Sequence, residues 1–237
     1  QPAALCRGLA ASLPSNVTVH EETPVIWLDE GPPHKLHTEG GTIRSPELVL
    51  ANNGFAVGFG FYARNLIPVM TWGSMTRPLT DEESASIGGD MSWGVIPAAP
   101  SGTTVRRLVD GRILIRNVYN YNRHSVADDR VRRRATKAHR VAFERRFPSL
   151  THVPFDYSWG GALSMARNGE PVFGRLADGI HGALVHNGTG LSRGAICGKL
   201  IAEMVCGEDS DLLDEMLTRG RPNRNLSDPL LGWGVNL

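Results

Sequence analysis

Several features are scarce in this sequence of 237 residues, and each shortage argues against a class of protein. No apolar run reaches the roughly 20 residues that a membrane-spanning helix needs, and no stretch has the pattern of a secretion signal. The cysteines Cys6, Cys197 and Cys206 are odd in number and lack C-x-x-C spacing. They therefore predict reduced thiols of a cytoplasmic protein, and neither a disulfide framework nor a zinc site.

An excess of one charge is also missing, because the formal net charge is +1. Near neutrality gives no reason to expect a nucleic acid or an anionic membrane as a partner. The arginine run 130–134 falls in a predicted helix at 128–147 without interleaved aromatic residues, so we interpret it as a solvated helix face. The histidines show no metal-ligand spacing, and no metal site is predicted.

The dinucleotide fingerprint G-x-G-x-x-G is absent as well. Gly188, Gly190 and Gly194 form G-x-G-x-x-x-G, which is one residue longer. The segment after them also lacks the second strand and the acidic residue that a Rossmann first turn requires. This stretch is therefore not predicted to be the start of a Rossmann unit.

The stretch 180–207, which contains these glycines, organises the sequence. It predicts a strand at 182–185, a turn at 186–190 and a helix from Leu191 onward. A helix that follows a glycine turn points its free N–H groups and its positive dipole end out of that turn, which suits a phosphate or the negative edge of a reduced ring. We expect Gly190 to be required for space or for a positive φ, and Arg193 to point elsewhere. The alternative is that the glycines serve packing alone.

Elsewhere in the chain, some segments have apolar residues at helical spacing and others alternate as strands do, which indicates a mixed α/β fold. An apolar run at 47–51 is typical of a strand buried in a parallel sheet, and it ends in Asn52-Asn53-Gly54, where ligands of open α/β sheets bind. Thr80 and Glu83 have the spacing of a capping box. The remaining expected elements are helices at 2–13 and 212–217, strands at 17–20, 25–28 and 156–159, and hairpins at 35–44 and 105–118.

The ordered motifs resemble those of the D-amino-acid-oxidase-like FAD-dependent oxidoreductases, a superfamily that includes glycine oxidase, sarcosine oxidase and gamma-glutamylputrescine oxidase. The similar segments are the helix at 2–13, VTVHEETPVIWL, ELVLANNG, WGGALSMARNGEPVFGRL and VHNGTGLSRGAICGKLIAEMV. They follow the family order across nearly the whole chain. Each motif is weak by itself, and the set indicates the superfamily without indicating a substrate.

The resemblance implies a division of the chain into two domains. Residues 1–54 and 160–237 are expected to form part of an FAD-binding Rossmann-like domain, and residues 55–159 a β-rich substrate domain. The family's glycine fingerprint unit is not among these segments. We therefore expect the C-terminal part of a longer enzyme, or a subunit whose partner carries that unit, with weak or no binding of FAD alone. Unpaired sheet edges would also favour association, including a homo-oligomer.

The resemblance also implies residues for a non-covalent FAD. Backbone N–H groups of the turn would face the pyrimidine edge of the flavin, and three other positions would lie near the cofactor. The implied cofactor residues are Val25, Ala51, Asn52, Gly188, Thr189, Gly190 and Leu191.

The substrate side is less well defined by the sequence. Leu163 stands where glycine-oxidase-like members carry an arginine for the substrate carboxylate, which leaves Arg167 and Arg106 as alternatives. Each is also explained as a surface or ion-pair arginine. The resemblance also implies that His186 lies near the flavin, where the family often has Tyr or His; the alternative is a hydrogen-bonded structural histidine.

Two functional hypotheses follow. The first is an FAD-dependent oxidoreductase that oxidises the C–N bond of a small amine or amino acid, by hydride transfer to flavin and hydrolysis of the imine. The second is a non-catalytic binding or regulatory subunit that kept the fold and lost the cofactor.

Overall fold

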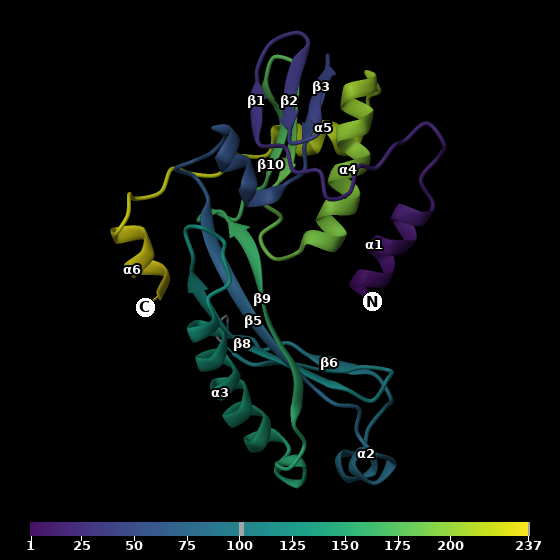
Figure 1. Cartoon of the computed structure of the whole chain (residues 1–237), viewed down its shortest axis with the longest axis vertical. Helices are drawn as coiled ribbons and strands as arrows, with labels where there is room; N and C mark the ends of the chain where they lie inside the picture. Colours follow the sequence, from purple (N-terminus) through teal and green to yellow (C-terminus); the bar gives the residue numbers. More distant parts are fainter. Residues whose placement is uncertain (100–101, 237) are drawn as a thin grey trace. The chain divides into compact units, whose positions relative to one another are not determined.

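The computed structural model describes residues 1–99 and 102–236, and it has the mixed α/β architecture that the sequence predicts (Figure 1). The chain divides into two compact units. Unit 1 contains residues 1–66 and 165–224, and unit 2 contains residues 67–164 and 225–237. The predicted cofactor and substrate roles of two domains remain predictions. No helix among the described residues is long and apolar enough to cross a membrane.

Unit 1 contains two three-stranded sheets. One sheet is antiparallel, in the order β1-β2-β3, and the other has the order β10-β11-β4. The strands are β1 (Trp27–Asp29), β2 (His34–Thr38), β3 (Gly41–Ser45), β4 (Leu48–Leu50), β10 (Val172–Ala177) and β11 (Ile180–Leu184). The helices are α1 (Pro2–Ala11), the 3₁₀-helix η1 (Asn53–Phe59), α4 (Gly190–Cys206) and α5 (Asp211–Thr218).

The pairing of β4 with β11 decides the layout of unit 1. These strands are parallel, with Ile180 opposite Leu48 and Gly182 opposite Leu50. Leu50, Ile180 and Leu184 belong to one buried apolar cluster. The strands β4 and β11 therefore pack together within unit 1. Because parallel strands end at the same edge of a sheet, the segments that follow them are neighbours.

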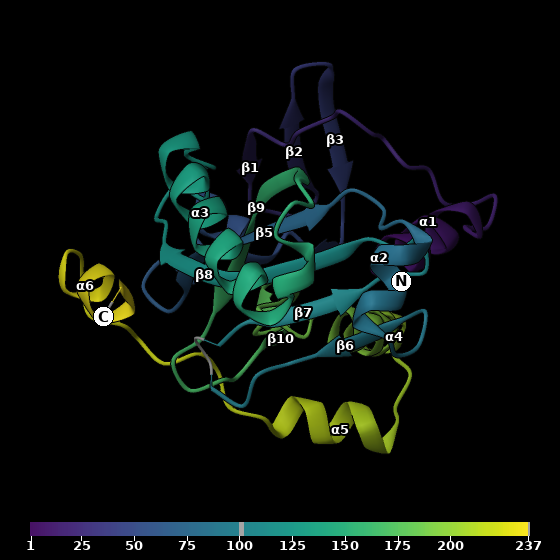
Figure 2. The same ribbon diagram turned by 90° about the horizontal axis from the view of Figure 1, so that it is seen from below.

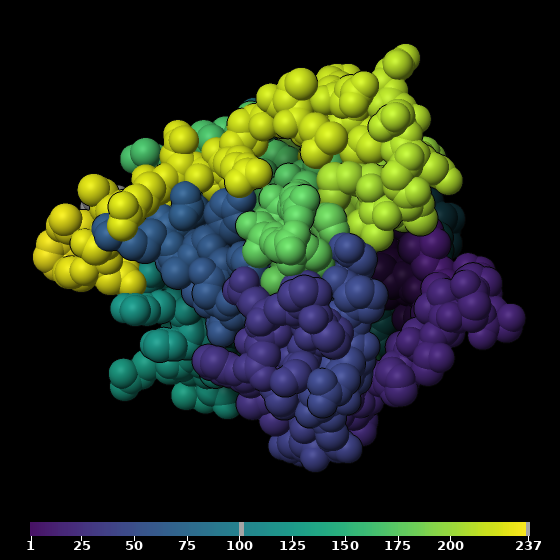
Figure 3. Space-filling model, turned by 90° about the horizontal axis from the view of Figure 1, so that it is seen from above, coloured from purple at the N-terminus to yellow at the C-terminus, as the bar shows by residue number. Residues whose placement is uncertain are grey.

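The N-terminal segment of unit 1 departs from the sequence prediction. Residues 17–20 form no strand, and Val17 and Val19 are exposed. Their β-branched pattern has no neighbouring strand to complete a ladder, and the Val17 N–H instead bonds the Pro14 carbonyl. Helix α1 has no buried residue, and the purple N-terminal segment stands out from the surface in Figure 3.

Unit 2 contains a five-stranded sheet in the order β6-β7-β8-β5-β9. Its strands are β5 (Ile67–Thr76), β6 (Trp93–Val95), β7 (Thr104–Arg107), β8 (Ile113–Tyr121) and β9 (Phe155–Met165). Its helices are α2 (Asp81–Ile87), α3 (Asp129–Arg146), the 3₁₀-helix η2 (Pro148–Leu150) and α6 (Leu230–Asn236). Helix α3 packs on β8 and β5, beside which it lies in Figures 1 and 2.

The sequence pattern explains why α3 forms and which face it buries. Asp128 caps the helix by accepting hydrogen bonds from the Arg130 and Val131 N–H groups. Ala135, His139 and Phe143 recur every fourth residue and are fully buried. The predicted capping box of α2 is also present, with Thr80 and Glu83 exchanging side chain–backbone bonds.

Candidate functional site at the carboxyl ends of β4 and β11

The segments that leave β4 and β11 are joined by an asparagine side chain. Asn53, three residues beyond the end of β4, accepts a hydrogen bond from the Val185 N–H at 3.1 Å. Ala51 and Asn52 therefore share one sheet edge with the turn at 186–190. This is the carboxyl edge of the strands, at which open α/β sheets bind their ligands.

The backbone at this edge is strained. Three non-glycine residues have positive φ, namely Asn53 at 52°, Val185 at 59° and Asn187 at 51°. Asparagine tolerates the left-handed region, but a β-branched residue there is an outlier. Val185 is also fully buried. Backbone strain of this kind costs on the order of 1–3 kcal/mol per residue and clusters at functional sites.

Helix α4 begins with exposed, unused hydrogen-bond donors. Thr189 uses its N–H and its hydroxyl on the His186 carbonyl, at 3.0 and 2.7 Å, and provides no side-chain cap to the helix. Within the described residues, the N–H groups of Gly190 and Leu191 have no acceptor. Both residues are exposed, so these N–H groups are available to a ligand.

The glycine that needs left-handed backbone is Gly188 and not Gly190. Gly188 has φ 82°, whereas Gly190 is absent from the positive-φ residues. A Cβ added at Gly190 meets nothing within 4 Å. The expectation that Gly190 needs a positive φ was therefore wrong, and the fold leaves open space at this position.

His186 lies beside α4, next to Gly194. A Cβ at Gly194 would lie 3.8 Å from its Nε2. Burial lowers the pKa of His186 below its usual value, and the positive charge of Arg193 lowers it further. The charge of Arg193 thus acts on His186, and the expectation that Arg193 points away from the flavin remains a prediction. Two buried atoms, His186 Nδ1 and Arg193 Nη1, have no hydrogen-bond partner, which leaves polar capacity for a ligand or water.

The two arginines proposed for the substrate lie in different units. Arg167 is exposed in unit 1, on the loop that follows β9. Arg106 lies on β7 of unit 2, where it is exposed opposite Leu114 of β8. Only Arg167 therefore shares a unit with His186.

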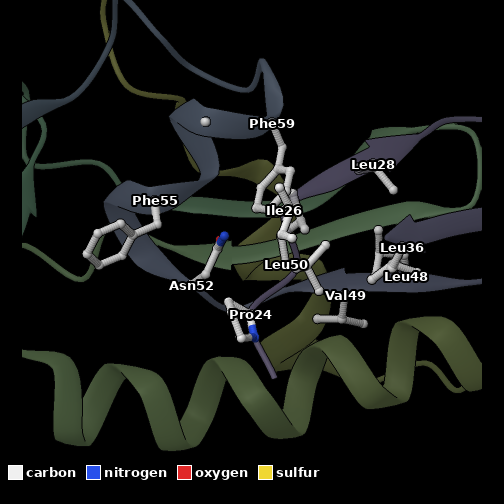
Figure 4. A pocket seen from close by; sticks show the side chains of 13 residues that line it. Pro24, Ile26, Leu28, Leu36, Leu48, Val49, Leu50, Asn52, Phe55 and Phe59 are labelled. Atoms are coloured by element: carbon white, nitrogen blue, oxygen red, sulfur yellow. The ribbon is translucent and has the colours of Figure 1, made fainter. Parts of the chain in front are cut away.

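A pocket of about 580 Å³ opens next to β4. Val25, Ala51 and Asn52, the three implied cofactor residues outside the turn, all line it. Figure 4 shows Asn52 there with apolar lining residues that include Ile26 and Val49. The residues of the glycine turn do not line this pocket. Asn52 Oδ1 is buried without a partner. An apolar pocket with one unused polar atom suits the flat ring of a cofactor held mainly by packing.

Sequence reasoning missed three residues of this site. Asn53, Asn187 and Arg193 were assigned no role, although the two asparagines hold the turn by hydrogen bonds and the charge of Arg193 acts on His186. The Asn-Asn-Gly and Asn-Gly pairs could have indicated left-handed backbone at these positions. No sequence signal identifies the orientation of Arg193, because it depends on which face of α4 packs inward.

The family model described as "FAD dependent oxidoreductase" matches residues 1–204, and the chain belongs to that family. "Probable oxidoreductase OrdL" of Haemophilus influenzae is 26% identical over 227 residues, covering 89% of this chain and 48% of that protein.

Two crystal structures of glycine oxidases have the same fold. The enzyme of Geobacillus kaustophilus has a TM-score of 0.72 at 22% identity, with 92% of this chain and 57% of that chain covered. The enzyme of Bacillus cereus has a TM-score of 0.64 at 16% identity, with 87% and 55% covered. The chain thus spans about half the length of the curated relatives it matches.

Proposed function

We propose that this chain is part of an FAD-dependent oxidoreductase that oxidises the C–N bond of a small amine or amino acid. The observation that carries the proposal is the exposed start of α4, with its free N–H groups, at the same sheet edge as Ala51 and Asn52. The names of the structural neighbours support the substrate class, because two of them are glycine oxidases.

FAD, when bound, supplies the hydride acceptor for this chemistry. The N–H groups of Gly190 and Leu191 would stabilise negative charge at the flavin edge in the manner of an oxyanion hole. They have no acceptor within the described residues, and the helix dipole adds positive potential at the same place. Val25, Ala51 and Asn52 would hold another part of the cofactor in the pocket beside β4.

His186 and Arg167 supply the groups for the substrate side. The lowered pKa of His186 keeps its imidazole neutral near pH 7, so the ring is able to accept a proton or a hydrogen bond there. Arg167 is exposed on the neighbouring loop, and its guanidinium suits a carboxylate. Hydride removal from an amino acid needs both a neutral amine and a held carboxylate, and these two side chains match those needs.

The proposal includes a partner segment for unit 1. Within the described residues β4 pairs on one side only, with β11. Ile26 and Val49, both in the pocket beside β4, are 61% and 40% exposed. An apolar pocket at an unpaired strand edge favours covering by another polypeptide segment. We infer that a nucleotide-binding segment, in the same polypeptide or a partner subunit, covers this edge and that the chain alone binds FAD weakly.

The experiment compares the chain alone with the assembly that it forms in cells. Each preparation is examined for flavin absorbance and then mixed anaerobically with glycine, N-methylglycine or a diamine. Glycolate is the matched control, because it keeps the carboxylate of glycine and replaces the amine by a hydroxyl. We expect flavin in the assembly and bleaching by at least one amine. Bleaching by glycolate alone, or a flavin-free assembly, would refute the proposed reaction and leave the non-catalytic alternative.

A further inference from the structure

The side chain of Asn187 connects two segments of unit 1, the loop after β9 and the end of β11. Its Oδ1 accepts a hydrogen bond from the Ala166 N–H at 2.7 Å. Its Nδ2 donates to the carbonyls of Gly169 and Val185, at 3.0 and 3.1 Å. One amide therefore binds the loop that carries Arg167 on one side and the end of β11 on the other.

The same amide completes a clamp on the strained residue Val185. The Val185 N–H donates to Asn53 Oδ1, and its carbonyl accepts from Asn187 Nδ2. The N–H and the carbonyl of Val185, which is buried and has left-handed backbone, are thus held by the side chains of two asparagines. Both asparagines also have left-handed backbone. Surroundings that over-determine a strained conformation in this way are what allow it to persist.

The strained residue sets the direction of the turn that follows it. Val185 stands immediately before His186, and the turn from His186 to Thr189 leads directly into α4. Relaxing Val185 toward extended backbone would rotate the following residues and redirect the first N–H groups of the helix. The clamp is therefore placed to fix those donors, and through Ala166 and Gly169 it ties them to the Arg167 loop.

We propose that Asn187 and Asn53 are positioning residues, which clamp Val185 in its left-handed conformation and so hold the donors of α4 and the Arg167 loop in one arrangement. The role in flavin placement rests on the proposed function, whereas the clamp itself does not. Asn168 is a matched asparagine whose hydrogen bonds do not involve the turn. Asn168, on the same loop, donates to the Arg221 carbonyl and accepts from the Asn223 N–H, and neither bond reaches the turn.

The first measurement is amide hydrogen exchange at Ala166 and Val185 in the chain, with circular dichroism to confirm folding. Asn187→Gly accepts the left-handed backbone but removes the side chain, and we expect exchange at Ala166 to rise at least tenfold. Asn187→Asp keeps the acceptor for Ala166 and loses both donor bonds, so exchange at Ala166 stays slow. Asn53→Gly is expected to release Val185, while Asn53→Asp keeps it protected.

The control Asn168→Gly removes two side chain–backbone bonds from the same loop and is expected to leave both amides unchanged. Wild-type exchange in Asn187→Gly, or the same acceleration in Asn168→Gly, would overturn the clamp. If Asn187→Gly does not fold, Asn53→Gly against Asn53→Asp decides the question at Val185.

The second measurement is the two-electron potential of the flavin in the assembled protein. N–H donors that no longer point at the flavin stabilise its anionic reduced form less. In Asn187→Asp we therefore expect the equilibrium constant for flavin reduction to fall about tenfold, which equals a potential lower by about 30 mV. An unchanged potential in a variant with the expected exchange pattern would reduce Asn187 to a structural residue and overturn the positioning role. An assembly that takes up no flavin would refute the proposed function instead, while the exchange data still decide the clamp.

Discussion

The substitution Gly190→Val separates the two explanations of the glycine turn, a ligand site or a packing device. The structure predicts almost no cost to the chain itself. Gly190 has no positive φ, it is exposed, and an added Cβ meets nothing within 4 Å. Valine has a slightly better helix propensity than glycine, so the free energy of unfolding should change by less than about 0.5 kcal/mol. Gly188 would give no such test, because any side chain there is strained at φ 82°.

The expected effect on the flavin is large, because a valine side chain would occupy the space that lets a ring approach the backbone. Losing one preorganised donor of an oxyanion-type site costs roughly 10²–10³ in rate, or about 2.7–4 kcal/mol. We therefore expect flavin reduction by substrate to slow by at least that factor in a folded variant. Gly198→Val is the matched control, because Gly198 is an exposed glycine of the same helix with nothing within 4 Å of its added Cβ.

The assay is anaerobic stopped-flow bleaching of the flavin in parent, Gly190→Val and Gly198→Val assemblies, with thermal unfolding of each chain in parallel. Equal stability with reduction lost only in Gly190→Val supports the ligand site. If folded, flavin-loaded Gly190→Val is reduced as fast as the parent, the turn serves packing alone. A loss of rate in Gly198→Val to the same degree would show that helix α4, and not the turn, is sensitive.

Four further outcomes test other parts of the structure. The pKa of Glu83 is lowered to about 2, chiefly by its hydrogen bond to Arg77. The free energy of unfolding of unit 2 should therefore fall by about 3 kcal/mol as pH falls from about 4.5 to 2, and Glu83→Gln should remove that pH dependence in acid titrations of unfolding. Burial lowers the pKa of His139 to about 4; it contributes stability above about pH 6.5 that is lost toward pH 4, and His139→Asn should flatten this window in the same titrations. Arg193→Met should raise the pKa of His186 toward its usual value in an NMR titration, because it removes a repelling charge; an unchanged pKa would contradict their proximity. Val49→Lys should reduce association through the exposed β4 edge, measured by size-exclusion chromatography, and an unaltered elution profile would count against that edge.

Much of the framework could be predicted because it depends on local pattern. The Thr80 cap, the hairpin at 35–44 and the helix at 128–147 are specified by residues close in sequence, and all three are present. The strand expected at 17–20 failed because a strand requires a partner, and partner availability is not a local property. The parallel pairing of β4 with β11 was not predicted, because it joins segments far apart in the sequence: 134 residues separate the bonded pair Glu47 and His181 at this edge.

For the candidate site, the sequence named Gly188, Gly190 and Asn52 and missed Asn53 and Asn187, and the reason is physical. Gly188 and Gly190 belong to a short motif with a known backbone consequence. Asn53 and Asn187 act through bonds that span 132 and 21 residues, to Val185 and Ala166. A buried β-branched residue after an apolar strand predicts more strand, and nothing in the sequence marks Val185 as the residue that instead turns the chain. Of the two side chains that hold its backbone groups, Asn187 is two residues away along the chain and Asn53 is 132 residues away. The property that directs α4 therefore belongs to the assembled edge, and to no single segment of the sequence.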